Sequence, residues 1–201
     1  MCVRRTLLGA ALLGLLLAGC GDDPAAQFNG RVLDNPYEVP ETALTATDGE
    51  PFSLAGDTDE PLTLVFFGYT HCPDLCPMVL NSLSAGLTKL DDADRERVQV
   101  VVVTTDPSRD TEPVMRRYLD GFDKSWEGLT GPLETIVDVA EPLGIFVNDG
   151  EKLPSGGYDL GGHSTSVIAI DESDHAWVYW DQDTSPAQFA SDIHFLLNEE
   201  A

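Results

Sequence analysis

Two continuous apolar runs constrain the fold more than any other feature of this sequence. Residues 62–67 and 98–104 consist almost entirely of Leu, Val, Phe and Thr, and such runs form strands that are buried on both faces. Between them, apolar residues recur at helical spacing; these are Val79, Leu80, Leu83, Leu87 and Leu90. A strand, a helix and a second buried strand in this order predict a parallel sheet covered by helices.

The rest of the chain completes an α/β pattern. A helix is expected over 112–119, with Thr111 as its cap, and another over 133–143. A Gly-rich, polar segment at 145–158 predicts a hairpin or an extended excursion, and antiparallel strands follow at 166–171 and 176–180. A last helix over 186–197 has Ser185 as its cap. This order predicts a thioredoxin-like fold with an inserted hairpin before the final β-hairpin and the C-terminal helix.

The N-terminus has the features of an export signal. Arg4 and Arg5 precede an apolar run over 7–18 that ends in Leu-Ala-Gly-Cys, and this run is shorter than the ~20 residues of a spanning helix. We therefore expect a lipoprotein signal peptide over 1–19 and a lipid on Cys20. The lipid would anchor the protein to the outer face of the cytoplasmic membrane, and the export route, Sec or twin-arginine, stays open.

The composition excludes some classes of partner for the mature protein. Residues 20–35 are polar, Gly-rich and without periodicity, which predicts a flexible tether, and residues 36–201 are long enough for one folded domain. The chain carries 35 Asp and Glu against 11 Lys and Arg. Such an acidic surface repels phosphates, which argues against nucleic acid as a partner.

The two cysteines of the folded domain are the candidate working residues. Cys72 and Cys76 lie between a buried strand and the start of a helix, where the helix dipole favours thiolate. Pro73 and Pro77 stiffen the segment. Two convergent thiolates can close a disulfide or hold a soft metal such as Cu(I). The Cys-x-x-x-Cys spacing is wider than that of thioredoxin-type oxidoreductases, which favours chelation without excluding redox cycling.

A histidine is the natural third ligand. His163 lies in a Gly-Gly-His-Ser loop just before the 166–171 strand, and in a thioredoxin-like fold this loop is beside the cysteine turn. Its nitrogen would let the site hold Cu(II) as well as Cu(I), although a loop histidine without a ligand role is an equal alternative. The side chain of His71 is expected to point away from the sulfurs, and Met78 is expected in the core.

Three motifs together resemble the Sco/SenC family. They are residues 67–77 (Phe-Gly-Tyr-Thr-His-Cys-Pro-Asp-Leu-Cys-Pro), residues 106–111 (Asp-Pro-Ser-Arg-Asp-Thr), and Tyr158 followed by His163 and Ser164. Members of this family are copper-binding proteins that help to assemble the Cu(A) centre of cytochrome c oxidase. The resemblance implies copper, as Cu(I) or Cu(II), bound by Cys72, Cys76 and His163. It also implies a site that can pass through a disulfide, and the Cu(A) subunit as partner.

Several questions stay open at this level. Gly162 stands where the family usually has an acidic residue, which bears on the hydrogen bonds around the ligand. Asp106, Arg109 and Tyr158 are expected near the metal, although Asp106 and Arg109 could instead pair to pin a loop. The leading function is a copper chaperone. The alternative is a thiol-disulfide reductase that keeps the copper-ligand cysteines of the oxidase, or other exported proteins, reduced.

Overall fold

The structure is a computed structural model that describes residues 28–58, 60–147, 151–152, 158–159 and 164–198. The expected signal peptide, the lipid site at Cys20 and the first part of the tether lie outside these residues. Within them, no helix has the length and apolar character needed to cross a bilayer.

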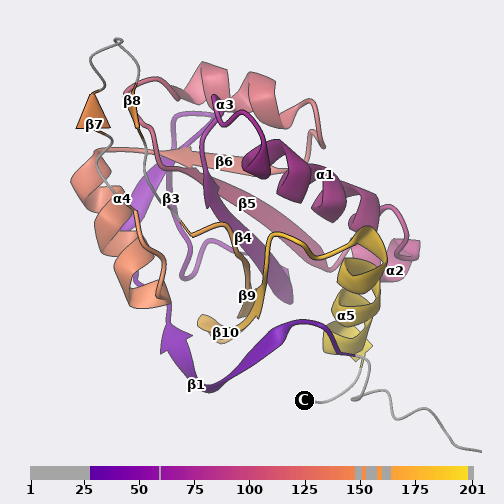
Figure 1. The fold of residues 1–201 in the computed structure, drawn as a ribbon. Coiled ribbons are helices and arrows are strands. Elements are labelled where there is room, and N and C mark those ends of the chain that lie inside the picture. The colour runs from indigo at the N-terminus through magenta and orange to yellow at the C-terminus, as the bar shows by residue number, and fades with distance from the viewer. Residues whose placement is uncertain (1–27, 59, 148–150, 153–157, 160–163, 199–201) are drawn as a thin grey trace, which may run out of the picture.

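One eight-stranded sheet forms the centre of the domain, with the order β1-β10-β9-β4-β5-β6-β2-β3 (Figure 1). The strands are β1 (Arg31–Glu38), β2 (Ala43–Ala46), β3 (Pro51–Ser53), β4 (Leu62–Gly68), β5 (Val98–Thr104), β6 (Glu127–Thr130), β9 (Val167–Asp171) and β10 (His175–Trp180). β4 and β5 run parallel, as the two apolar runs predicted, and β6 is parallel to β5. β9 and β10 form the predicted antiparallel pair.

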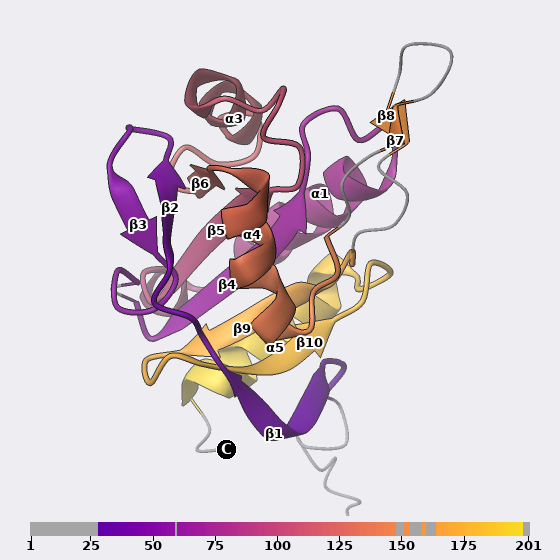
Figure 2. The same cartoon turned by 90° about the vertical axis from the view of Figure 1, so that its left-hand side faces the viewer.

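Helices cover both faces of this sheet. They are α1 (Leu75–Leu87), α2 (Asp92–Arg95), α3 (Glu112–Leu119), α4 (Leu133–Ala140) with the short helix η2 (Glu141–Leu143), and α5 (Pro186–Asn198). Buried residues of α1, α3 and α5 share one core cluster, and those of α4 belong to another. Figure 2 shows α4 across the near face of the sheet, with α1 and α5 behind it.

The continuous apolar runs follow from this double covering. Leu64 and Phe66 of β4 point into the cluster under α1 and α5, whereas Val65 and Phe67 point into the cluster under α4. Successive side chains of a strand alternate between faces, so a strand with helices on both sides needs apolar residues at every position. The continuous apolar pattern of the sequence therefore agrees with a sheet that has helices on both faces.

The start of the fold differs from the expectation. The tether was expected to extend to residue 35, but β1 begins at Arg31 and pairs with β10. Just before it, the backbone N–H groups of Asn29 and Gly30 donate to the buried carboxylate of Asp192 in α5, at 3.0 and 2.8 Å. Contacts from the far end of the chain thus order a segment that has no pattern of its own.

The inserted segment forms a small separate sheet. β7 (Glu151–Lys152) and β8 (Tyr158–Asp159) pair antiparallel, as the sequence-based hairpin implied. β2, β3 and β6 were not predicted, because strands of three or four residues are too short to show a periodicity.

Candidate functional site

The cysteine motif lies where β4 and β5 end. β4 runs into a loop over 69–74 and then into α1, and β5 runs into a loop over 105–111 that leads to α3. The two loops are joined at their base, because the N–H of Thr105 donates to the carbonyl of Gly68 at 2.7 Å. The parallel register of the strands therefore brings the first two sequence motifs together.

Cys72 and Cys76 face each other across the start of α1. Neither is in a disulfide; Cys72 is partly exposed, and Cys76 is only 1% exposed. The N–H of Cys76 donates to Cys72 Sγ at 3.2 Å. Asp74, at the N-cap position, makes no capping bond with its side chain, so the sulfur of Cys72 supplies an acceptor for one of the free N–H groups of the first turn.

The buried sulfur is a thiol at rest. Burial raises the pKa of Cys76 well above its ordinary value, and its hydrogen bond with Cys72 raises that pKa further. The expectation that the helix dipole favours thiolate is therefore wrong for Cys76, because desolvation outweighs the dipole. A metal ion at this sulfur must displace a proton.

Two residues at the end of β4 lie against the sulfurs. Tyr69 makes a side-chain hydrogen bond with Cys72, and burial together with the nearby thiols raises the pKa of Tyr69 to about 12. A Cβ on Gly68 would lie 2.5 Å from the ring of Phe66 and 3.1 Å from Cys76 Sγ. A side chain at position 68 would thus collide with the ring and crowd the buried sulfur, so glycine is required there.

A buried aspartate holds the cysteine loop against β5. Asp110 accepts hydrogen bonds from the Thr70 N–H at 2.9 Å, from Thr70 Oγ1 at 2.5 Å and from Thr104 Oγ1 at 2.8 Å. Its side chain is 0% exposed. The residue belongs to the second motif, but sequence reasoning did not single it out. The signal available was its position beside Asp106 and Arg109 in that motif.

Asp106 and Arg109 pair with each other inside the same loop. The guanidinium Nε of Arg109 donates to Asp106, and Ser108 Oγ donates to the other carboxylate oxygen at 2.7 Å. The pair therefore pins the 105–111 loop. The charge of Arg109 also acts to lower the pKa of Tyr69, which puts the guanidinium near a residue that contacts Cys72.

The described histidines lie away from the sulfurs or on the surface. Nδ1 of His71 is 3.0 Å from Thr70 Oγ1 and 3.7 Å from Asp110, and its side chain is 54% exposed. The side chains of His175 and His194 are also exposed, and His194 pairs with Asp94 at 2.5 Å.

The third ligand cannot be placed from the described residues. His163 lies outside them, and only the backbone of Tyr158 is described, in β8. In the part of the chain that is described, no group of three or more His, Cys, Asp and Glu could hold a metal ion. Met78, expected in the core, is 41% exposed on the outer side of α1, so that expectation was wrong.

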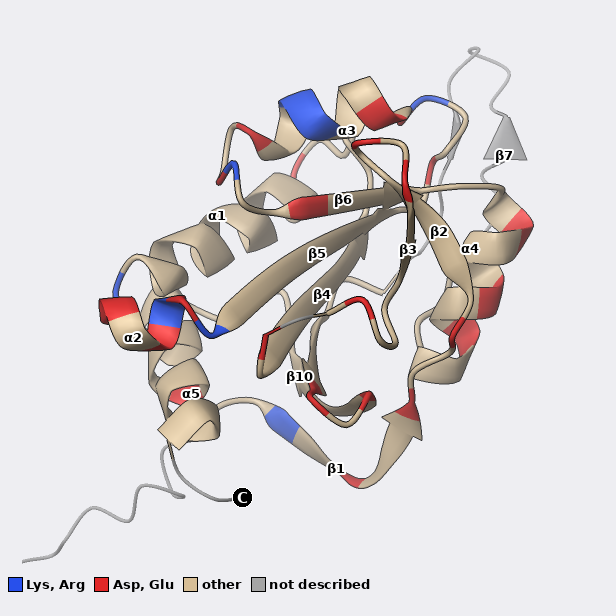
Figure 3. Ribbon diagram, turned by 180° about the vertical axis from the view of Figure 1, so that it is seen from behind, with Lys and Arg blue, Asp and Glu red and all other residues tan. Residues whose placement is uncertain are grey.

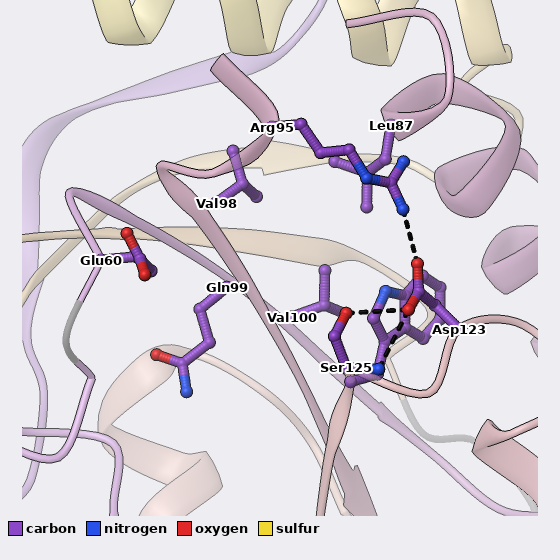
Figure 4. Close-up of a pocket in the computed structure, with 9 residues that line it drawn as sticks. Glu60, Leu87, Arg95, Val98, Gln99, Val100, Asp123 and Ser125 are labelled. Carbon is purple, nitrogen blue, oxygen red and sulfur yellow. Dashed lines mark hydrogen bonds and ion pairs between the residues drawn. The ribbon is translucent and has the colours of Figure 1, made fainter. Parts of the chain in front are cut away.

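A cavity of about 270 Å³ lies at the other end of β5 (Figure 4). Val98, Gln99 and Val100 line it together with an ion pair between Arg95 and Asp123, whose N–O distance is 2.6 Å. Because Cys72 and Cys76 follow the carboxyl end of β4, this cavity belongs to a different part of the molecule from the thiols.

The comparison with known families decides the identity of the fold. The sequence pattern of the SCO1/SenC family matches residues 34–198 of this chain. The chain belongs to the SCO1/SenC family. The thioredoxin-like fold inferred from the order of elements is therefore confirmed, and so is the resemblance carried by the three motifs.

Solved Sco structures and a curated relative agree with this assignment. Apo Sco1 of Thermus thermophilus is 33% identical, with a TM-score of 0.74 over 84% of this chain and 96% of that one. Copper-bound ScoI of Bradyrhizobium japonicum is 28% identical, with a TM-score of 0.66 over 80% and 96%. Mitochondrial SCO2 of Saccharomyces cerevisiae is 30% identical over 172 residues, which are 80% of this chain and 57% of the yeast protein.

Proposed function

We propose that this protein is a copper chaperone that binds copper through Cys72, Cys76 and His163 and delivers it to the Cu(A) site of cytochrome c oxidase. The observation that carries the proposal is the pair of reduced thiols held together by the Cys76 N–H and Cys72 Sγ contact of 3.2 Å. Thiolate sulfur is the ligand that Cu(I) prefers. The Bradyrhizobium relative, solved with copper bound, supports the same metal.

The unequal exposure of the two sulfurs suits a copper ion that the protein must first take up and then release. Cys72 is partly exposed and can meet incoming copper, and Cys76 is buried and can hold it away from water. Transfer then proceeds by ligand exchange between thiolates of the donor and the acceptor. Each thiol gives up its proton to solvent when the metal binds.

The proposed third ligand directly precedes an ordered stretch of backbone. Ser164 N–H donates to the carbonyl of Phe146, and Phe146 N–H donates to Ser164 Oγ, both at 3.2 Å. Two reciprocal bonds therefore fix the residue after His163 to Phe146, three residues after the end of η2. This arrangement gives the chain a fixed point directly after the proposed ligand.

Metal binding by the reduced protein tests the proposal. We expect one copper per chain, loss of binding in Cys72→Ser and Cys76→Ser, and a changed Cu(II) absorption spectrum in His163→Ala. His175→Ala is the matched control, because its imidazole is exposed in the β9–β10 hairpin, and it should leave the spectrum unchanged. Wild-type protein that binds no copper, or an unchanged spectrum in His163→Ala, would contradict the proposal.

A thiol-disulfide reductase is the second candidate. The unequal exposure of the two sulfurs favours it as well, because one thiol can meet a substrate while the other stays buried. The thiolate of Cys72 would attack a substrate disulfide, and Cys76 would then displace the substrate thiol and leave a Cys72–Cys76 disulfide. Two electrons pass to the substrate, so an external dithiol must reduce the protein again. A measured potential too oxidising to reduce the oxidase cysteines excludes this role, and rescue of a deletion strain by added copper favours delivery.

A further inference from the structure

The helix that carries Cys76 has no charged residue. α1 contains no Asp, Glu, Lys or Arg, whereas every other helix in the described part of the chain contains at least one. In Figure 3, α1 is accordingly drawn in tan. Surface helices normally place charged residues on the face that points away from the core. The outer face of α1 therefore departs from the rest of a strongly acidic molecule.

This outer face begins with two exposed apolar side chains. Leu75 is 39% exposed and Met78 is 41% exposed, and residues three apart are neighbours on the surface of a helix. Asn81, one turn further on, is also exposed, but its side-chain amide donates to the carbonyl of Pro77 at 2.6 Å. The amide is thus engaged with the backbone of its own helix. The outer face of α1 offers a partner mainly apolar contact.

The apolar face starts at the exposed thiol. Leu75 directly precedes Cys76, whose N–H donates to Cys72 Sγ at 3.2 Å, so this sulfur lies against the first turn of α1. Cys72 is also the more exposed of the two cysteines. Ligand exchange between two proteins requires a thiolate of the acceptor to bind the metal while the donor still holds it. A protein that reaches a metal at Cys72 must therefore cover the first turn of α1.

We propose that the outer face of α1, with Leu75 and Met78 at its start, is the docking surface for the protein that receives copper from Cys72. This protein meets the helix with an apolar patch beside its own thiols. The inference rests on the proposed delivery of copper. Protein interfaces are depleted of charged residues at their centre and enriched in Met, as this face is. A second copy of the chain fits less well, because each copy has a formal net charge of -24 and like charges repel.

Copper transfer from two variants tests this assignment. In Met78→Gln and in Leu75→Gln, the rate constant for Cu(I) transfer to the soluble Cu(A) domain of the oxidase should fall about fivefold, and in the double variant about tenfold or more. Both variants should bind Cu(I) like the wild type in competition with a chelating dye. They should also lose Cu(I) to that dye at the wild-type rate, because a small molecule needs no docking surface. Damage to the copper site itself would change the affinity as well.

Val32→Gln is the matched control. Val32 is an apolar residue that is 54% exposed, and it lies in β1, on a different side of the domain from α1 (Figures 1 and 2). The same substitution there should leave transfer to the Cu(A) domain unchanged. Transfer from Met78→Gln and Leu75→Gln at the rate of the wild type and of Val32→Gln would overturn the assignment.

A titration followed by NMR separates docking from delivery. When the Cu(A) domain is added to reduced, copper-free protein, amide signals of residues 75–85 should shift or broaden, those of β1 should not, and Met78→Gln should weaken the effect. Wild-type protein that binds copper but transfers none to the domain would contradict the delivery function. The titration then decides about the surface, and the absence of changes on α1 overturns it. A dimer of the wild type that Met78→Gln dissociates in sedimentation would assign the face to a second copy instead, which also contradicts the proposal.

Discussion

Two buried aspartates in different regions of the molecule show two uses of the same side chain. Asp110 lies under the cysteine loop at the end of β5, and its donors are Thr70 and Thr104. Asp192 lies in α5, where β1 meets the edge of the sheet, and its donors are Asn29, Gly30 and Trp180 Nε1. Both side chains are almost fully buried, and each accepts at least three hydrogen bonds.

The difference lies in what the donors belong to. The donors of Asp192 join the first described residues to the last helix, which closes the fold. Thr70, which gives Asp110 two of its hydrogen bonds, belongs to the loop that carries Cys72, so the same kind of satisfied carboxylate positions a reactive group. Other acidic residues lie on α2, α4 and the connecting loops (Figure 3), and two of them, Asp94 and Asp106, are buried as well. A buried carboxylate therefore supports folding or function according to where its donors lie.

Asp192→Ala should have the largest effect on stability. It leaves two backbone N–H groups and the indole N–H of Trp180 unpaired, so we expect a loss of about 3 kcal/mol or more in the free energy of unfolding. Urea denaturation measures the loss, and copper affinity should stay unchanged. The matched control is Asp183→Ala, an exposed aspartate nearby, which should cost less than about 0.5 kcal/mol. A lower copper affinity in Asp192→Ala would contradict the conclusion that Asp192 supports only folding whereas Asp110 positions the cysteine loop.

Asp110→Asn should lower both stability and metal affinity. The amide keeps the shape but turns one oxygen into a donor that faces the donors of Thr70 or Thr104, at a cost of about 2 kcal/mol in unfolding free energy. The cysteine loop loses its anchor, so Cu(I) affinity should fall about tenfold or more in a dye competition. Metal binding equal to that of the wild type would show that Asp110 serves the fold alone, as Asp192 does.

Alkaline pH should weaken the region around the cysteines. The folded protein holds the pKa of Cys76 above its ordinary value of 9.0, so the unfolded chain releases this proton first. The stabilisation is complete below pH 9 and is lost as pH rises toward the folded pKa, by about 1 kcal/mol per pH unit. Urea midpoints between pH 8 and 11 measure this slope for the reduced protein. Cys76→Ser should remove this contribution, and an equal slope in that variant would contradict the assignment.

Low pH should destabilise a different region, the contact between α2 and α5, and the loss of stability should be smaller than that at alkaline pH. Burial acts to raise the pKa of Asp94, but hydrogen bonds from Asn198 and His194 outweigh it and hold this pKa below its ordinary value of 3.8. The stabilisation is present above this value and is lost as pH falls through the folded pKa. Asp94→Asn should cost about 1 kcal/mol at neutral pH and flatten the acid limb of the urea midpoints. Copper binding at neutral pH should not change, since Asp94 lies away from the sulfurs.

The sequence predicted most of the fold and the two sulfurs of the site. The strands at 62–67 and 98–104 and the helix at 112–119 appear almost residue for residue in β4, β5 and α3. The errors concern burial and pairing. Met78 follows a proline into a helix that packs on the core, yet it faces solvent. Whether Met78 faces the core or solvent depends on how α1 is rotated over the sheet. The spacing of apolar residues near the start of the helix does not define this rotation.

The sequence by itself determined the order of the central strands and the longer helices and put two thiols between a strand and a helix, because periodicity and turn residues are local properties. Only the tertiary structure decided that Cys76 is the buried sulfur and that Asp110 anchors the loop. Burial and hydrogen-bond satisfaction depend on residues far apart in the chain. Asn29 and Asp192, separated by 163 residues, meet only once the sheet and its helices are assembled.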